Sequence, residues 1–82
     1  MISKEAIVSY VQKKMPDAEV TIVDKTGMMD HFQIEIISEK FIGVNLLDRQ
    51  RSVYDALNEP MKDGRIHAME IRSKTPEEAL KV

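Results

Sequence analysis

The chain has 82 residues, which is enough for one small domain and too few for a second. Hydrophobic residues make up 43% of it and charged residues 32%, a balance that is typical of globular domains and excludes a disordered chain. The formal net charge of −2 argues against a protein whose main task is to coat nucleic-acid phosphates.

The first part of the chain predicts a helix followed by two strands. Ser3 can cap a helix at about residues 4–15, where apolar residues recur at helical spacing. Residues 20–23 are all β-branched, and residues 31–36 alternate between apolar and polar, so both segments predict strands. Residues 24–30 have no periodicity and are expected to form a loop that lets the two strands pair antiparallel.

The second part predicts a helix, a strand and a short last helix. Asn45 can cap a helix that Pro60 closes. The side of this helix that is expected to face the core comprises Leu46, Leu47, Gln50, Val53, Tyr54 and Leu57. A third strand follows at residues 66–72. Thr75-Pro76-Glu77-Glu78 is a capping box with proline at the first helical position, which predicts the start of the last helix.

The resulting order is α-β-β-α-β-α, which predicts the α+β class. The helix between the second and third strands makes these strands parallel if they share a sheet, with a right-handed crossover. We therefore expect a mixed three-stranded sheet with the first two helices packed on one face.

The chain contains no cysteine and two histidines, His31 and His67. This composition excludes disulfides, a thiol nucleophile, a Cys-rich zinc site and a self-sufficient iron–sulfur site. Any metal chemistry must use the two imidazoles, carboxylates, or ligands from a partner.

No apolar run approaches the roughly 20 residues of a membrane span, and the first residues do not begin a secretory signal. We therefore expect a cytoplasmic protein without a membrane partner.

Several segments, taken together in their order along the chain, resemble the BolA-like family. They are His31-Phe32-Gln33-Ile34, which resembles the branch of the family with a His-Phe pair, Phe41-Ile42-Gly43, Arg49-Gln50-Arg51-Ser52-Val53-Tyr54, Ile66-His67-Ala68-Met69 and Thr75-Pro76-Glu77-Glu78. The resemblance extends over about residues 3–80, so residues 1–82 are expected to form a single BolA-like domain. It implies a type II KH-like fold, pairing with a monothiol glutaredoxin, a 2Fe–2S cluster shared by the two proteins and, in some members, DNA binding.

The resemblance implies metal-ligand roles for both histidines. His67 matches the histidine that serves as a cluster ligand in the family, and a neutral imidazole can replace a thiolate on iron. The other interpretation is a strand-end histidine whose ring packs against Met69 and hydrogen-bonds a carbonyl. A second family ligand comes from the loop between the first two strands. There His31 is the strong donor, because the thioethers of Met28 and Met29 are poor ligands for ferric iron. His31 could instead fix the start of the second strand.

Six basic residues are candidates for a partner or nucleic-acid surface, namely Arg49, Arg51, Lys62, Arg65, Arg72 and Lys74. Arg49 is expected to meet an acidic partner surface or a phosphate. The other interpretation is that both arginines of the second helix are solvated and pair with Asp48 or Asp55. None of the three glycines begins a G-x-x-G clamp, with which KH domains approach phosphates, so any DNA binding must rest on side chains.

These features predict an adaptor and not an enzyme, because the chain has no Ser-His-Asp spacing and no phosphate-binding loop. By the resemblance, the glutaredoxin supplies a cysteine to the labile 2Fe–2S cluster, a bound glutathione supplies another thiolate, and this chain supplies His67 and His31. The complex would serve iron–sulfur trafficking or iron sensing. Alone, the chain is expected to bind no cluster and to be a monomer or a weak homodimer. The alternative function is a DNA-binding regulator of stress response and cell morphology.

Overall fold

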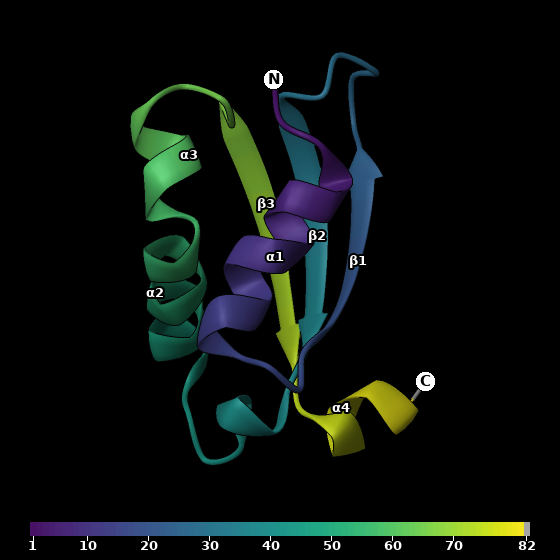
Figure 1. Ribbon diagram of the computed structural model, residues 1–82. Coiled ribbons are helices and arrows are strands. Elements are labelled where there is room, and N and C mark those ends of the chain that lie inside the picture. Colours follow the sequence, from purple (N-terminus) through teal and green to yellow (C-terminus); the bar gives the residue numbers. More distant parts are fainter. Residues whose placement is uncertain (82) are drawn as a thin grey trace.

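The computed structural model describes residues 1–81 and combines a three-stranded sheet with helices (Figure 1). The elements in chain order are α1 (Lys4–Lys14), β1 (Glu19–Asp24), β2 (His31–Ile37), the 3₁₀ helix η1 (Glu39–Phe41), α2 (Leu46–Ala56), α3 (Asn58–Lys62), β3 (Ala68–Lys74) and α4 (Pro76–Leu80). The predicted α+β class and the order α-β-β-α-β-α are confirmed, with η1 and α3 as additions. No helix among the described residues is long and apolar enough to cross a bilayer.

The sheet has the strand order β1-β2-β3. β1 pairs antiparallel with β2, and β2 pairs parallel with β3, so the sheet is mixed as predicted. In Figure 1, β2 and β3 point the same way, and the chain between them returns through α2 and α3 on the side of the sheet where α1 also lies. This return is the predicted right-handed crossover. Because β2 and β3 run in the same direction, their first residues lie at the same end of the sheet.

The core lies between the helices and the sheet. Residues of β2 alternate between buried and half-buried, and the buried side chains of Phe32, Ile34 and Ile36 are at most 1% exposed. Ile7 and Val11 of α1 are fully buried against the same cluster. Burying one such large apolar side chain stabilises a fold by about 1.5–3 kcal/mol. Hydrophobic contact between the two layers therefore holds the first helices on one face of the sheet, as predicted.

The face of α2 that packs on the core differs from the prediction. Leu46 and Leu47 are 67% and 60% exposed, and Gln50 is exposed as well. Val53 and Leu57 are buried as predicted, but Arg49 is buried with them and Tyr54 is 44% exposed. Arg49, Val53 and Leu57 recur every four residues, which also fits one face of a helix. Hydropathy alone therefore places the buried stripe to one side of its observed position. An arginine can take an inward position when its hydrocarbon stem packs and its head group finds polar partners.

Two predicted boundaries are also wrong. α2 ends at Ala56, and Pro60 lies in the first turn of α3, where the missing N–H of proline costs no helical hydrogen bond. The third strand comprises Ala68–Lys74, whereas residues 66–72 were predicted. His67 therefore precedes the strand and lies in the connection that leads into it.

The short helix η1, which leaves no periodic signal in the sequence, is held by Asp17 in the turn after α1. The carboxylate of Asp17 accepts hydrogen bonds from the Glu39 N–H at 2.7 Å and from the Ser38 hydroxyl at 2.9 Å. These two bonds, the Glu39 bond foremost, lower the pKa of Asp17. The contact fastens the end of β2 to the turn that enters β1.

Candidate metal-ligand site

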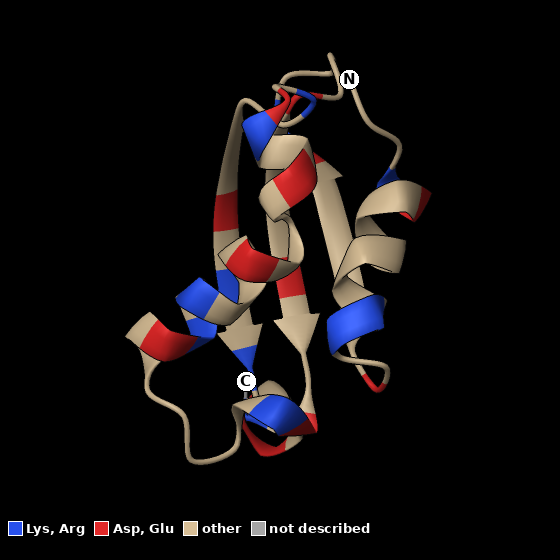
Figure 2. Ribbon diagram, turned by 60° about the vertical axis from the view of Figure 1, so that its left-hand side comes forward, with Lys and Arg blue, Asp and Glu red and all other residues tan. Residues whose placement is uncertain are grey.

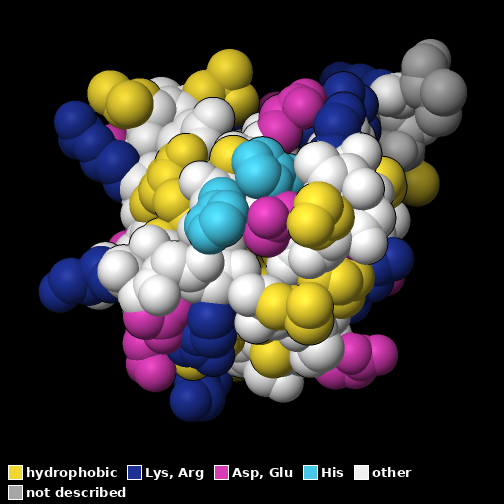
Figure 3. Space-filling model, turned by 90° about the horizontal axis from the view of Figure 1, so that it is seen from above, with side chains coloured by type: hydrophobic (Ala, Val, Ile, Leu, Met, Phe, Trp, Pro, Cys, Tyr) yellow, Lys and Arg dark blue, Asp and Glu magenta, His cyan; other side chains and the backbone are white. Residues whose placement is uncertain are grey.

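The parallel pairing of β2 and β3 brings the two histidines together. His31 begins β2 and is paired in the register with Ala68, the first residue of β3. His67 directly precedes Ala68, and its backbone N–H donates to the carbonyl of Asp30 over 2.8 Å. The ring centroids of His31 and His67 are 5.9 Å apart. The two histidine side chains appear as neighbouring cyan groups on the end of the molecule that Figure 3 shows from above.

A carboxylate lies between the two imidazoles. His31 Nδ1 is hydrogen-bonded to Asp30 Oδ1 at 2.8 Å, and His67 Nδ1 lies 3.3 Å from Asp30 Oδ2. The three residues offer one ligand atom each, and these atoms lie within 4.8 Å of one another, so the group could hold a metal ion. The sequence reasoning did not select Asp30, because it falls in a segment without periodicity. Its position directly before His31 was the one feature of the sequence that could have indicated a role for Asp30 at the site.

Hydrogen bonds order the loop between β1 and β2, and Thr26 contacts Asp30 directly. Asp24 accepts a hydrogen bond from the Met29 N–H at 3.1 Å, and the hydroxyl of Thr26 donates to Asp30 Oδ1 at 3.1 Å. Met29 has a φ of 58°, a left-handed conformation that a residue with a Cβ adopts rarely and that such bonds support. The hydrogen bond with His31 lowers the pKa of Asp30, and the bond from Thr26 adds to this effect. Asp30 is therefore an ionised acceptor beside both rings at neutral pH.

The site is accessible to a second protein. The side chains of His31 and His67 are 43% and 60% exposed. Imidazole nitrogens are ligands for iron, and a 2Fe–2S cluster needs four protein or thiol ligands. Because the chain has no cysteine, it can offer two imidazoles to such a cluster, and the remaining ligands must come from elsewhere. The donor set therefore fits a cluster that is shared between proteins.

Arg49 takes neither of its two predicted roles, because it is buried. It is 7% exposed, its Nε donates to the Val44 carbonyl at 2.8 Å, and its Nη1 lies 2.7 Å from Glu78 Oε1. Its guanidinium also lies 5.7 Å from the centroid of the Phe41 ring. The hydrogen bond from Arg49, followed by that from the Thr75 N–H, lowers the pKa of Glu78 to about 2. Arg49 therefore links α2 to α4, and its guanidinium is already occupied by Glu78 and the Val44 carbonyl.

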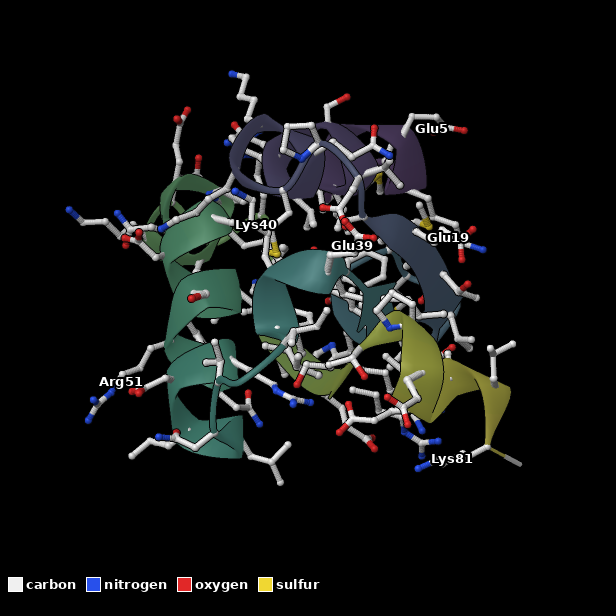
Figure 4. All side chains as sticks on the ribbon, turned by 90° about the horizontal axis from the view of Figure 1, so that it is seen from below. Glu5, Glu19, Glu39, Lys40, Arg51 and Lys81 are labelled. Atoms are coloured by element: carbon white, nitrogen blue, oxygen red, sulfur yellow. The ribbon has the colours of Figure 1, made fainter. Side chains whose placement is uncertain are left out.

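The other basic candidates are spread over the molecule. Lys62 and Arg65 precede β3, Arg72 lies within it, and Lys74 ends it. Arg51 projects outward from α2 in the view from below (Figure 4). Four of these residues lie 2.8 to 3.5 Å from a carboxylate, in the pairs Arg51–Asp48, Arg65–Asp63, Arg72–Glu70 and Lys74–Glu35. The alternative prediction of a pair with Asp48 is thus confirmed for Arg51.

Positive and negative residues are interspersed over the elements that Figure 2 shows, and blue and red segments lie close to one another. Arg65 illustrates this mixing, because its guanidinium reaches Asp63 at 2.8 Å, Glu59 at 3.6 Å and the hydroxyl of Tyr10 at 3.0 Å. The hydrogen bonds with Tyr10, foremost, and with Asp63 raise the pKa of Arg65. The predicted basic residues therefore do not combine into one continuous positive surface.

Comparison with known proteins identifies the family. The sequence pattern of the family described as BolA-like protein matches residues 9–78. The protein BOLA2 of Arabidopsis thaliana is 35% identical over 80 residues, which cover 95% of this chain and 84% of that protein.

Solved structures agree with the sequence match. BolA1 from Arabidopsis thaliana has a TM-score of 0.82 and 35% identity, with 94% of this chain and 98% of that chain covered. The BolA domain of SufE1 from the same plant has a TM-score of 0.79 and 29% identity, with 95% of this chain and 99% of that chain covered. The fold, the matched residues and these relatives agree, and the chain belongs to the BolA-like family.

Proposed function

We propose that this chain is an adaptor that pairs with a monothiol glutaredoxin and offers His67 and His31 as ligands to a 2Fe–2S cluster held between the two proteins. The observation that carries the proposal is the pair of exposed imidazoles at one end of the sheet in a chain without cysteine. When bound, such a cluster stores and transfers iron and sulfide, and imidazole ligation raises its reduction potential. The complex would serve iron–sulfur trafficking or iron sensing.

Membership of the BolA-like family supports this class of function. The family fits an iron–sulfur-related role, and a BolA domain also forms part of SufE1. The match indicates a family of adaptor or regulatory proteins and no catalytic family. The class of adaptor therefore agrees with both the donor set and the relatives.

The net charge and the pairing of the basic residues favour the adaptor over a DNA-binding protein. The net charge is −2, Arg49 is buried, and four further candidates of the basic set each lie beside a carboxylate. A DNA-binding surface gains affinity from cations that are free to replace the counterions of phosphates. Arginines and lysines that already contact carboxylates must first give up those contacts.

The proposal is tested by anaerobic reconstitution. The chain is mixed with the monothiol glutaredoxin of its own organism, glutathione, iron and sulfide, and the visible absorption and circular dichroism are recorded. The expected spectrum differs from that of the glutaredoxin alone. The chain by itself should be colourless after desalting, since it has no thiolate. Stoichiometric iron and sulfide on the isolated chain would overturn the argument from its donors.

The decisive variant is His67→Ala, which should abolish or strongly destabilise the shared cluster and leave the fold intact. Its side chain is 60% exposed and lies outside β3, so its removal leaves the core unchanged. Glu70→Ala is the matched control, because this exposed side chain is three residues further along and contacts Arg72. If His67→Ala gave the spectrum and stability of the unmodified protein, the chain would be a glutaredoxin-binding surface and no ligand donor.

A further inference from the structure

The carboxylate of Asp30 decides which nitrogen of each candidate ligand is available. His31 Nδ1 is hydrogen-bonded to Oδ1 at 2.8 Å, and His67 Nδ1 lies 3.3 Å from Oδ2. An ionised carboxylate accepts hydrogen bonds and cannot donate them. Each ring therefore satisfies Asp30 best when Nδ1 carries the proton, which leaves the lone pair of that ring on Nε2.

We propose that Asp30 is a positioning residue, whose carboxylate holds His31 and His67 in the Nδ1–H tautomer and turns both Nε2 lone pairs outward toward a metal partner. Carboxylates that fix the tautomer and orientation of ligating histidines in this way are common partners of metal sites. What the two Nε2 atoms bind rests on the proposed function, whereas the tautomers are properties of the chain alone.

The position of Asp30 is itself fixed from both strands. Its backbone carbonyl accepts the N–H groups of His67 at 2.8 Å and Ala68 at 3.3 Å, so it is tied to the start of β3. Its side chain receives the hydroxyl of Thr26 at 3.1 Å. The two rings meet edge to face at 86°, which lets each of them direct one nitrogen at the same carboxylate. One residue thus sets the place of His67 through the main chain and the orientation of both rings through the side chain.

Asp24 provides a matched comparison within the same loop. Its carboxylate accepts the backbone N–H groups of Thr26, Gly27 and Met29 at 3.0 to 3.3 Å and orders the loop. Its bonds go to the backbone of the loop, whereas the carboxylate of Asp30 is hydrogen-bonded to the Thr26 hydroxyl and the His31 ring and lies 3.3 Å from His67 Nδ1. A variant at Asp24 therefore perturbs the loop through its backbone, while a variant at Asp30 removes the acceptor from the imidazoles.

The tautomers are measured on the ¹⁵N-labelled chain alone, at about pH 8 where imidazoles are neutral, by long-range ¹H–¹⁵N correlation. Both rings of the unmodified chain should show the Nδ1–H pattern. Asp30→Ala should return both to the Nε2–H form that an unconstrained neutral imidazole prefers, and Asp24→Ala should keep the Nδ1–H form. Far-UV circular dichroism establishes that each variant is folded.

Either ring in the Nε2–H form in the unmodified chain would overturn the inference. So would an Asp24→Ala variant that changes the tautomers as much as Asp30→Ala does, because the effect would then come from the loop.

Cluster retention in the complex with the glutaredoxin supplies the second readout. Asp30→Ala should weaken cluster retention by roughly 10- to 100-fold, the usual effect of losing the partner of a metal-ligating histidine. If His67→Ala releases the cluster and Asp30→Ala does not, the inference fails and the proposed function stands. If His67→Ala has no effect on the cluster while the tautomers are Nδ1–H, the proposed function fails and the positioning of the rings stands.

Discussion

Arg49 on α2 and Glu78 on α4 form an ion pair in which Nη1 and Oε1 are 2.7 Å apart, although the two residues are separated by 29 positions in the chain. The pair is asymmetric, because 8% of the arginine side chain and 47% of the glutamate side chain are exposed. The same carboxylate accepts the Thr75 N–H at 2.8 Å and completes the capping box of α4. One glutamate thus both begins α4 and fastens it to α2.

Arg49→Ala should lower the free energy of unfolding by about 1–3 kcal/mol, because it deprives the Val44 carbonyl of its side-chain donor and removes a buried stem from the core. Urea denaturation followed by far-UV circular dichroism measures the change. Arg51→Ala is the matched control, since this exposed arginine contributes a surface pair with Asp48 that stabilises little. Equal losses in the two variants would contradict a special role for the buried arginine.

The pair also predicts how stability depends on acid. The pKa of Glu78 is lowered from 4.5 to about 2 in the folded protein, so its contribution is complete above pH 4.5 and is lost as the pH falls toward 2. Urea midpoints at a series of pH values should therefore fall through this window, and Glu78→Gln should flatten that fall. The fall should not vanish, because Asp17 and Asp30 also have lowered pKa values.

Glu77→Gln is the control for the acid experiment, because this neighbouring carboxylate contacts the exposed Lys81 at 3.5 Å. It should keep the pH dependence of the unmodified protein. A Glu78→Gln variant with an unchanged acid profile would show that the ion pair does not stabilise the folded state.

The pairing of the sheet could be predicted because its signals are local. The alternation of residues 31–36 marks β2, and the helical connection between the second and third strands then makes β3 parallel to it. The inward position of Arg49 on α2 could not be predicted, because its burial depends on Glu78 and on the carbonyl of Val44, which only the folded chain brings near. Likewise, the start of β3 is set by hydrogen bonds to the Asp30 carbonyl, which have no counterpart in hydropathy.

The candidate site, like the fold, could be predicted only in part from the sequence. His31 and His67 could be selected as donors from a chain with two histidines and no cysteine, and the parallel register explains why they meet. The role of Asp30 between them depends on the backbone bonds that tie its carbonyl to the start of β3 and on the hydroxyl of Thr26. A loop without periodicity gives no indication of which way its side chains face, so this residue required the structure.

The alternative of DNA binding makes a separate prediction. We expect weak duplex binding that appears at low salt and disappears at physiological ionic strength, because the basic residues are spread out and mostly paired. Fluorescence anisotropy at two salt concentrations measures it, with Arg72→Ala and Lys74→Ala as variants and Glu5→Ala as a control on α1. Sub-micromolar, sequence-selective binding at physiological salt would instead favour the DNA-binding regulator over the adaptor.

The last prediction separates the roles of the two histidines. His31 and His67 contact opposite oxygens of the Asp30 carboxylate, and both side chains are exposed. We therefore expect both to be ligands. His31→Ala should then destabilise the shared cluster as much as His67→Ala does. Titrating each variant into the glutaredoxin complex and following the visible circular dichroism of the cluster gives the comparison. His31 also begins β2 and its carbonyl accepts the Lys25 N–H at 2.8 Å, but that main-chain bond survives the substitution. A cluster that tolerates His31→Ala while losing its spectrum in His67→Ala would therefore leave His31 with the structural role of fixing the start of the strand, and would require the fourth ligand to come from the partner.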